Sequence, residues 1–216
     1  AIDKIVLELH DAKEYGSILQ VSKQNWDVLY LRFVEIANDI HIYRDIVLNQ
    51  LLPLVKCAEI LSKQYEVVVT NPPYLSNARF SLKLDKFIKK NYLDEKFDLS
   101  MVMYKRALQG FCKENCFVSF ITTNSWMVLS RFEKIRQYVL NNYCFDSIVD
   151  FGTELFEGKV GHNPIVAWVN RKARLNNKMT AIRLVEYCYS RRDEKEQEFF
   201  NKDNYFYPNK INFTYI

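Results

Sequence analysis

The stretch Tyr65-Glu66-Val67-Val68-Val69-Thr70-Asn71-Pro72-Pro73-Tyr74 decides the fold class of this chain. Its β-branched centre has no polar alternation, which predicts a parallel strand covered on both faces. Asn71 to Tyr74 end that strand abruptly. Because ligands of an open α/β sheet bind at the carboxyl ends of its strands, this tetrapeptide lies where a functional site is expected.

Strands and helices alternate on the carboxyl side of this stretch. Apolar spacing predicts helices around 82–91, 98–113 and 131–142, and strands around 116–122, 145–151, 165–170 and 180–187. This alternation predicts an α/β layered sheet. Residues 191–216 are polar and aromatic with weak periodicity, and no role is assigned to them.

The amino-terminal part reads as helical throughout. Apolar stripes at 3.6-residue spacing run through residues 1 to about 64, and Pro53 is expected to kink or divide the last of these helices. Because the pattern changes near Gln64, we expect three parts: a helical arm over 1–64, an α/β part over 65–172 and a carboxyl-terminal extension over 173–216.

Composition restricts the class of protein. The 216 residues are 49% hydrophobic and 26% charged, with a net charge of +4, which indicates a globular protein that is neither disordered nor membrane-embedded. Five cysteines without a C-x-x-C pair suit reduced thiols in the cytoplasm. Cys112 and Cys116 are interpreted as packing residues rather than zinc ligands, and no metal is expected. No signal peptide and no membrane span is predicted.

Glycine is scarce, with five in the chain. Their spacing allows neither a G-x-G-x-x-G motif nor a P-loop, so the sequence contains no glycine-rich phosphate-binding loop of these types. The chain also opens on Ala1 without an initiator methionine. We therefore expect a fragment of a longer protein.

The tetrapeptide Asn71-Pro72-Pro73-Tyr74 has an unusual balance of hydrogen-bonding groups. Its two prolines stiffen the backbone and remove two N–H donors, which leaves the Asn71 side-chain oxygen and the Pro72 carbonyl as acceptors. Two acceptors suit an exocyclic amino group, whose nitrogen lone pair they can direct at an electrophile such as a methyl donor. The Tyr74 ring offers a face for an extruded base, worth about 1 to 3 kcal/mol. The alternative is an ordinary turn.

On these residues the sequence resembles the N6-adenine DNA methyltransferases, whose hallmark is a [D/N/S]-P-P-[Y/F/W] loop after a strand of a Rossmann-like sheet. Residues 97–108, 120–127 and 132–136 resemble the elements that follow this loop in the family. Residues 52–74 together with 11–17 look like the PglX-type methyltransferases of BREX phage-defence systems. The resemblance covers about residues 64–172 and implies a partial Rossmann-like methyltransferase sheet of three αβα layers, with the helical arm as a family insertion.

The resemblance also implies roles for individual residues. Asn71 and Pro72 would accept hydrogen bonds from the adenine amino group, and Tyr74 would stack on the flipped base. Phe132 falls where some members place a second aromatic ring, although it also fits a core position. Pro73 and Met103 fall where relatives border S-adenosyl-L-methionine, the implied cofactor; Met103 equally fits a packing position.

The family pattern is incomplete in this chain. The glycine-rich S-adenosylmethionine motif is absent, and the target-recognition region expected on the carboxyl side is missing or barely begun. The chain alone is therefore expected to bind cofactor weakly, if at all, and to be inactive.

A group of lysines suggests a DNA contact. Lys83, Lys86, Lys89 and Lys90 are expected along the phosphate backbone of double-stranded DNA. The alternative is a solvated helix face. Gly158 to Pro164 reads as a loop, and His162 within it stays unassigned. Other phage-defence subunits are further expected partners.

Three functions from different classes remain open. The first is catalysis by a site-specific DNA adenine-N6 methyltransferase of a bacterial restriction-modification or phage-defence system. The second is glutamine-N5 methylation of a protein, because release-factor methyltransferases use the same N-P-P-Y loop. The third is a non-catalytic DNA-binding subunit that retains the loop without turnover.

Overall fold

The computed structural model of the chain describes residues 1–156, 163–171, 179–187 and 191–207. Contacts divide the chain into two compact units, Ala1–Gln64 and Tyr65–Ile216. This division falls at the change of pattern near Gln64. The second unit includes the residues after 172, and a separate extension over 173–216 stays a prediction.

The first unit is helical. Its helices are α1 (Ile2–Glu8), α2 (Ala12–Tyr15), α3 (Trp26–Asn38), α4 (Arg44–Ile46) and α5 (Leu52–Ser62), with a 3-10 turn at Gly16–Ile18. Ile5 on α1 and Val55 and Ala58 on α5 are buried, and α1 contacts α5. On α3, Leu29 and Phe33 are buried one helical turn apart, as the apolar stripe predicts.

Pro53 changes the helix around it, as expected. It lies in the first turn of α5, and the preceding residues Val47–Leu51 form a π-helical segment between α4 and α5. A proline has no N–H to donate to the carbonyl four residues back, and its ring crowds that carbonyl. The helix therefore widens locally before Pro53 and continues after it.

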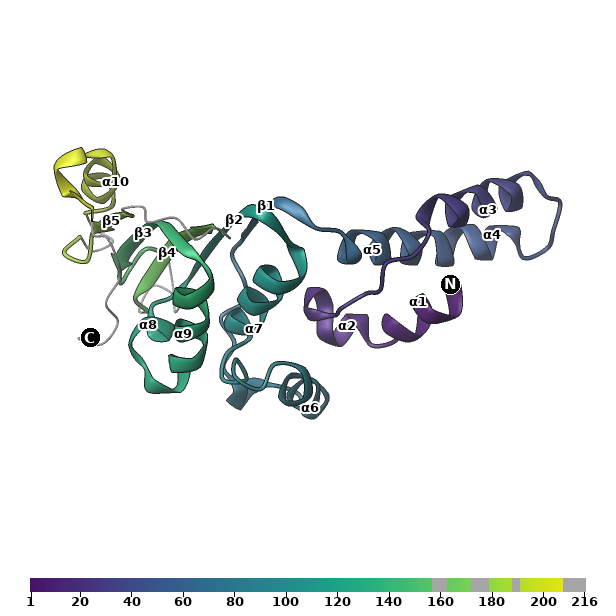
Figure 1. Cartoon of the computed structure of the whole chain (residues 1–216), viewed down its shortest axis with the longest axis horizontal. Coiled ribbons are helices and arrows are strands. Elements are labelled where there is room, and N and C mark those ends of the chain that lie inside the picture. Colours follow the sequence, from purple (N-terminus) through teal and green to yellow (C-terminus); the bar gives the residue numbers. More distant parts are fainter. Residues whose placement is uncertain (157–162, 172–178, 188–190, 208–216) are drawn as a thin grey trace. The chain divides into compact units, whose positions relative to one another are not determined.

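The second unit contains the sheet (Figure 1). Its strands are β1 (Tyr65–Thr70), β2 (Cys112–Thr123), β3 (Cys144–Gly152), β4 (Ile165–Arg171), β5 (Thr180–Arg183) and β6 (Tyr205–Phe206). Its helices are α6 (Leu82–Asn91), α7 (Leu99–Arg106), α8 (Ser125–Val128), α9 (Glu133–Asn142) and α10 (Arg192–Phe200). Shorter 3-10 turns lie at Asn77–Arg79, Ser130–Phe132 and Lys202–Asn204. None of the described helices is long and apolar enough to cross a lipid bilayer.

Several element bounds differ from the sequence prediction. The helix expected over 98–113 ends at Arg106 and continues as a π-helical turn over Ala107–Phe111. β2 then begins at Cys112, which pairs with Tyr65, so strand pairing takes residues that helical periodicity had assigned to the helix. The strand expected over 180–187 ends at Arg183, where its pairing with β3 ends.

The strand order confirms the α/β class. Within the described residues the order is β1-β2-β4-β3-β5-β6. β1 runs parallel to β2 and β3 runs parallel to β5, while β4 lies antiparallel between β2 and β3. The parallel pair β1 and β2 is joined by a crossover that contains α6 and α7, as parallel strands require.

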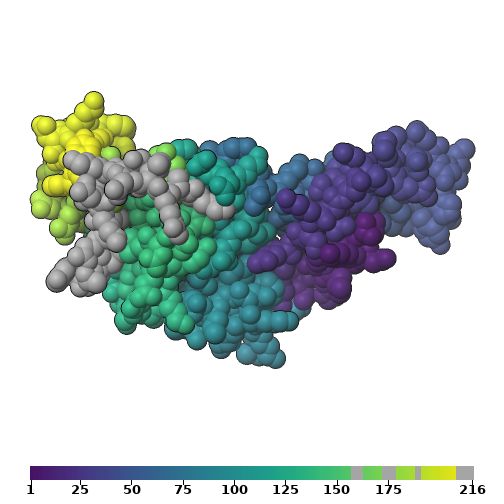
Figure 2. Space-filling view, in the orientation of Figure 1, coloured from purple at the N-terminus to yellow at the C-terminus, as the bar shows by residue number. Residues whose placement is uncertain are grey.

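Helices cover both faces of the sheet around β3. Ile148 belongs to the main core, together with buried residues of α7, α8 and α9, whereas its neighbour Val149 belongs to a smaller cluster with Phe199 of α10. Consecutive strand residues point to opposite faces. The described part of the unit therefore has a layer of helices on each side of the sheet, and α10 forms the yellow knob of surface in Figure 2.

Aromatic rings fill the main core. Tyr104 packs against Phe120 and Trp168, with ring centroids 5.1 Å apart in both pairs, and is fully buried. Its hydroxyl donates to the buried side-chain oxygen of Asn170. This bond satisfies both polar groups inside the core and ties α7 to β4.

β1 corrects one expectation. Val67 and Val69 are 57% and 71% exposed, while Val68 packs against the main core. β1 is an edge strand of the described sheet and is covered on one face, not on both. Its run of valines therefore exposes apolar side chains on the face that no helix of this described unit covers.

Candidate active site

The tetrapeptide Asn71 to Tyr74 leaves β1 at the carboxyl edge of the sheet. β1 and β2 run parallel with Thr70 opposite Phe120, so their carboxyl ends are neighbours. The Tyr74 hydroxyl lies 2.8 Å from Asn71 Oδ1 and 3.2 Å from the carbonyl oxygen of Ile121 on β2. The single phenolic proton is shared between these acceptors, which links the loop to the neighbouring strand.

The residues after the loop anchor it to the start of α7. The backbone N–H of Leu75 donates to the Pro73 carbonyl at 3.1 Å, and the Leu75 carbonyl accepts from Leu99 at 2.9 Å. Asn77 N–H donates to the Phe97 carbonyl at 3.1 Å. The loop is therefore fixed by main-chain bonds at its carboxyl side, which adds to the stiffness of the two prolines.

The four loop residues differ in exposure. Asn71 and Pro73 are exposed, Tyr74 is half-buried and Pro72 is buried. The exposed Asn71 amide retains one further lone pair on Oδ1 beside the one that accepts from Tyr74. Burial raises the pKa of the Tyr74 hydroxyl above its usual value of 10, so at neutral pH this group is a donor.

Asp98 caps the helix that holds the loop. Its side chain accepts from the backbone N–H of Ser100 at 2.9 Å and from the Ser100 hydroxyl at 2.6 Å. Burial raises the pKa of the Asp98 carboxyl, and the Ser100 bonds oppose that rise. The cap fixes the first turn of α7, whose Leu99 N–H binds the loop.

Phe132 lies in the main core. Its ring has no exposed surface and packs edge-to-face with Phe97 at a centroid distance of 6.3 Å, inside the main core. Phe132 joins the 3-10 turn before α9 to the core. Its position fits the packing alternative, and base stacking by Phe132 stays a prediction.

The two residues expected to border the cofactor lie in different environments. Pro73 is exposed beside Asn71. Met103 is half-buried on α7 and packs against the main core. Pro73 is thus placed to border a ligand at the loop, while cofactor contact by Met103 stays a prediction.

The four lysines lie on α6, and all are exposed. The apolar side of this helix buries Leu84 and Ile88, and the Ser81 hydroxyl caps its amino end at 3.1 Å. Lys89 forms an ion pair with Asp85 at 2.6 Å. The helix therefore presents a basic face, as the sequence predicts; contact with DNA is not tested by its geometry.

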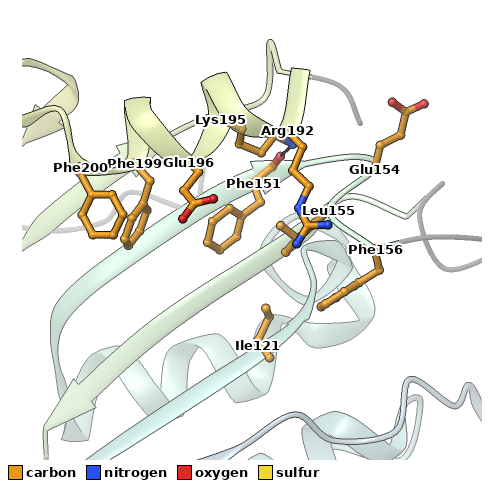
Figure 3. A pocket seen from close by; sticks show the side chains of 10 residues that line it. All are labelled: Ile121, Phe151, Glu154, Leu155, Phe156, Arg192, Lys195, Glu196, Phe199 and Phe200. Carbon is orange, nitrogen blue, oxygen red and sulfur yellow. Dashed lines mark hydrogen bonds between the residues drawn. The ribbon is translucent and has the colours of Figure 1, made fainter. Parts of the chain in front are cut away.

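Sequence reasoning missed a cavity of about 510 Å³ beside the loop (Figure 3). Its walls include Ile121, Phe151 and residues of α10. The Ile121 carbonyl also accepts the hydrogen bond from the Tyr74 hydroxyl. The weak periodicity of residues 191–207 hid this role. Two features of the sequence could have indicated the cavity: the aromatic pair Phe199-Phe200 and Gly152 at the end of a strand. In the structure Gly152 has a positive φ of 64°. The predicted loop residues Gly158 to His162 lie outside the described residues.

Comparison with known proteins identifies the family. The family model described as "Eco57I restriction-modification methylase" matches residues 2–156. The chain belongs to this family. The match includes both the helical arm and the loop Asn71 to Tyr74.

Two curated relatives are similar over most of this chain. The adenine-specific methyltransferase BrxX of Escherichia coli O9:H4 (strain HS) is 31% identical over 163 residues, which cover 73% of this chain and 13% of the relative. The adenine-specific methyltransferase PglX of Lacticaseibacillus casei (strain Zhang) is 33% identical over 153 residues, covering 69% and 12%. The chain thus spans about an eighth of the length of these relatives. These similarities agree with the resemblance to the PglX type.

A solved structure shares the fold. The ATP-dependent Type ISP restriction-modification enzyme LlaBIII, bound to DNA, aligns with a TM-score of 0.52 and 14% identity. The alignment covers 81% of this chain and 14% of that enzyme. At this identity the likeness supports the α/β architecture alone.

Proposed function

We propose that this chain supplies the amino-group-binding loop of a site-specific DNA adenine-N6 methyltransferase in a bacterial restriction-modification or phage-defence system. The observation that carries the proposal is the exposed Asn71, whose oxygen is positioned by Tyr74 at the carboxyl edge of the sheet. Family membership and two relatives named as adenine-specific methyltransferases support the same substrate.

The loop residues act on the amino group of an extruded adenine. Asn71 Oδ1 and the Pro72 carbonyl accept hydrogen bonds from its two N–H groups. These two hydrogen bonds direct the nitrogen lone pair toward the methyl donor. The Tyr74 ring stacks on the base and offsets part of the cost of unstacking it, by about 1 to 3 kcal/mol. The proton that the nitrogen releases passes to solvent, because Asn71 is exposed.

The described loop can contact only an apolar part of the cofactor. S-adenosyl-L-methionine supplies the methyl group when bound. Pro73 offers an exposed apolar border next to Asn71, in keeping with the proposed contact. The loop has no glycine-rich stretch of backbone donors for the polar parts of the cofactor, so we propose that other residues of the complete protein hold those parts.

The proposal includes double-stranded DNA as the partner, in the cytoplasm, with further phage-defence subunits as additional partners. Lys83, Lys86 and Lys90 are spaced so that they share one side of α6, opposite Leu84 and Ile88. This basic face suits a phosphate backbone. Because the relatives are named for adenine, methylation of a protein glutamine is the weaker alternative.

Substitution of Asn71 tests the proposal. The complete natural protein is produced as wild type and as Asn71→Ala, and methylated adenine in host DNA, S-adenosylmethionine binding and DNA binding are measured. Removing one preorganised acceptor is expected to lower methylation about 10²- to 10³-fold, with both binding affinities retained. Asn142→Ala is the matched control, since the exposed Asn142 side chain at the end of α9 donates to the Tyr138 carbonyl at 2.7 Å, within its own helix.

Two other results would replace the proposal. Methylation of a release factor by the wild type, without methylated adenine, would identify a glutamine methyltransferase. DNA binding with no methylation of either substrate would identify a non-catalytic subunit.

A further inference from the structure

The cavity beside the loop is separate from the amino-group site. It is lined by Ile121 of β2, Phe151 of β3, Leu155 and Phe156 of the loop after β3, and residues of α10. Asn71, Pro72 and Tyr74 are not among its lining residues. At about 510 Å³ it lies within the usual range of small-ligand pockets. An amino group held by Asn71 therefore lies outside this space.

A buried lysine builds one wall of the cavity. Lys195 is 5% exposed, and its ammonium donates to the carbonyls of Phe151 at 2.9 Å and Thr153 at 3.2 Å (Figure 3). Between these carbonyls lies Gly152, where a Cβ would come within 2.7 Å of Val185 Cα. Lys195 thus joins the carbonyls of Phe151 and Thr153 across Gly152, in the turn after β3.

The same turn contains a strained residue. Glu154 has a φ of 62°, in the left-handed region that non-glycine residues seldom occupy. Such a conformation persists where the surroundings fix it, and it is common at ligand sites. The Lys195 ammonium bonds the carbonyl of Thr153, the residue directly before Glu154, so this part of the cavity wall is tied to α10.

The walls offer flat apolar faces. Phe151 and Phe199 are stacked with centroids 6.1 Å apart and an interplanar angle of 23°, and Phe200 meets Phe199 edge-on at 5.0 Å. Rings of this kind are platforms for heterocycles. Arg192 and Glu196 stand one helical turn apart on α10, and their side chains extend beside Phe151 (Figure 3). The rim thus offers donors from a guanidinium and acceptors from a carboxylate.

We infer that this cavity binds a nucleobase other than the adenine that is methylated. Every base combines a flat ring with an edge that has both donors and acceptors, which matches the Phe walls, the Arg192 guanidinium and the Glu196 carboxylate. A phosphate alone is a poor match, because two carboxylates, Glu154 and Glu196, also line the space. The inference rests on the proposed function. A base displaced from DNA and a free nucleotide share this chemistry.

Photocrosslinking locates the bound base. The complete protein is mixed with duplexes that contain its recognition sequence, as mapped from host DNA, and 5-iodouracil or 5-iodocytosine at one position at a time. After irradiation, mass spectrometry identifies the labelled peptide. We expect labelling of Phe151, Phe199 or Phe200 from a base other than the target adenine. The double variant Arg192→Gln/Glu196→Gln should lower the yield about tenfold, whereas Glu194→Gln, whose residue pairs with Arg191, should not change it.

Each further result decides between sources or rejects the inference. Labelling by free 5-iodo-dUMP alone supports a free nucleotide as the ligand. A duplex with 8-azidoadenine at the methylated position that labels α10 would make the cavity part of the target site and overturn the inference. Absence of labelling from every probe would overturn it as well. Asn71→Ala separates the two proposals, because it should lower methylation about 10²- to 10³-fold and leave the crosslink intact.

Discussion

At the scale of single residues, the Tyr74 hydroxyl connects the candidate catalytic loop with the strand beside it. Its bonds to Asn71 Oδ1 and to the Ile121 carbonyl join two groups that are 50 residues apart in the sequence. The hydroxyl orients the amide oxygen, while the ring face contributes to base binding. These two contributions of one side chain can be separated by substitution.

Tyr74→Phe is expected to reduce kcat for methylation about threefold to tenfold, because it removes one neutral hydrogen-bonding group but keeps the ring. KM for DNA should stay unchanged. Tyr74→Ala should also raise KM for DNA, since it loses stacking worth about 1 to 3 kcal/mol. Steady-state kinetics of the complete protein distinguish the two variants; equal kinetic effects of both would show that the ring does not stack on the base.

The same residue predicts a pH dependence. Burial raises the pKa of Tyr74 above 10, so its proton is retained through neutral pH and is lost only at a higher pH than for a free tyrosine. Its contribution to positioning Asn71 should therefore be constant between about pH 6 and 9 and contribute no alkaline limb there.

The positions of residues were predictable where they depend on neighbours in the sequence. Asn71 to Tyr74 follow a strand directly, so their position at the sheet edge could be inferred from local pattern alone. Phe132 could not be placed in this way, because its burial depends on contact with Phe97, which lies on another element. An apolar residue at a helix start fits a core and a base pocket equally well, and only packing decides between them.

At the scale of elements, α6 shows how one helix separates packing from charge. Leu84 and Ile88 are buried, one turn apart, and the lysines occupy exposed positions. The helix bounds agree with the sequence prediction, since an amphipathic period and a Ser81 cap are local signals. α7 was predicted too long, because pairing of Cys112 with Tyr65 is a long-range contact that periodicity does not contain.

Charge removal on α6 tests its proposed contact with DNA. The triple variant Lys83→Gln/Lys86→Gln/Lys90→Gln should weaken binding evenly across DNA sequences and reduce the slope of log K against log salt by about 2.7. The control triple Lys113→Gln/Lys134→Gln/Lys202→Gln removes the same charge from exposed lysines elsewhere. Salt titrations of DNA binding measure both slopes. An equal change in the two variants would indicate a general effect of net charge, and no contact by α6.

At the scale of the whole molecule, the second unit holds the loop firmly but leaves one face of β1 uncovered. The second unit has its own aromatic core, and main-chain bonds hold the loop against α7. β1, however, pairs only with β2 within the described sheet and leaves Val67 and Val69 exposed. β1, which leads into the loop, therefore has less cover than an apolar strand usually receives.

A chain limited to these 216 residues should therefore fold but not catalyse. Circular dichroism is expected to show mixed α/β structure, because both units have buried cores. Calorimetry should detect no S-adenosylmethionine binding at concentrations that saturate the complete protein, since the spacing of the five glycines in the sequence allows no glycine-rich cofactor motif. Adenine methylation by the purified chain, abolished by Asn71→Ala, would contradict this expectation and show that residues outside the glycine-rich motif suffice to hold the cofactor.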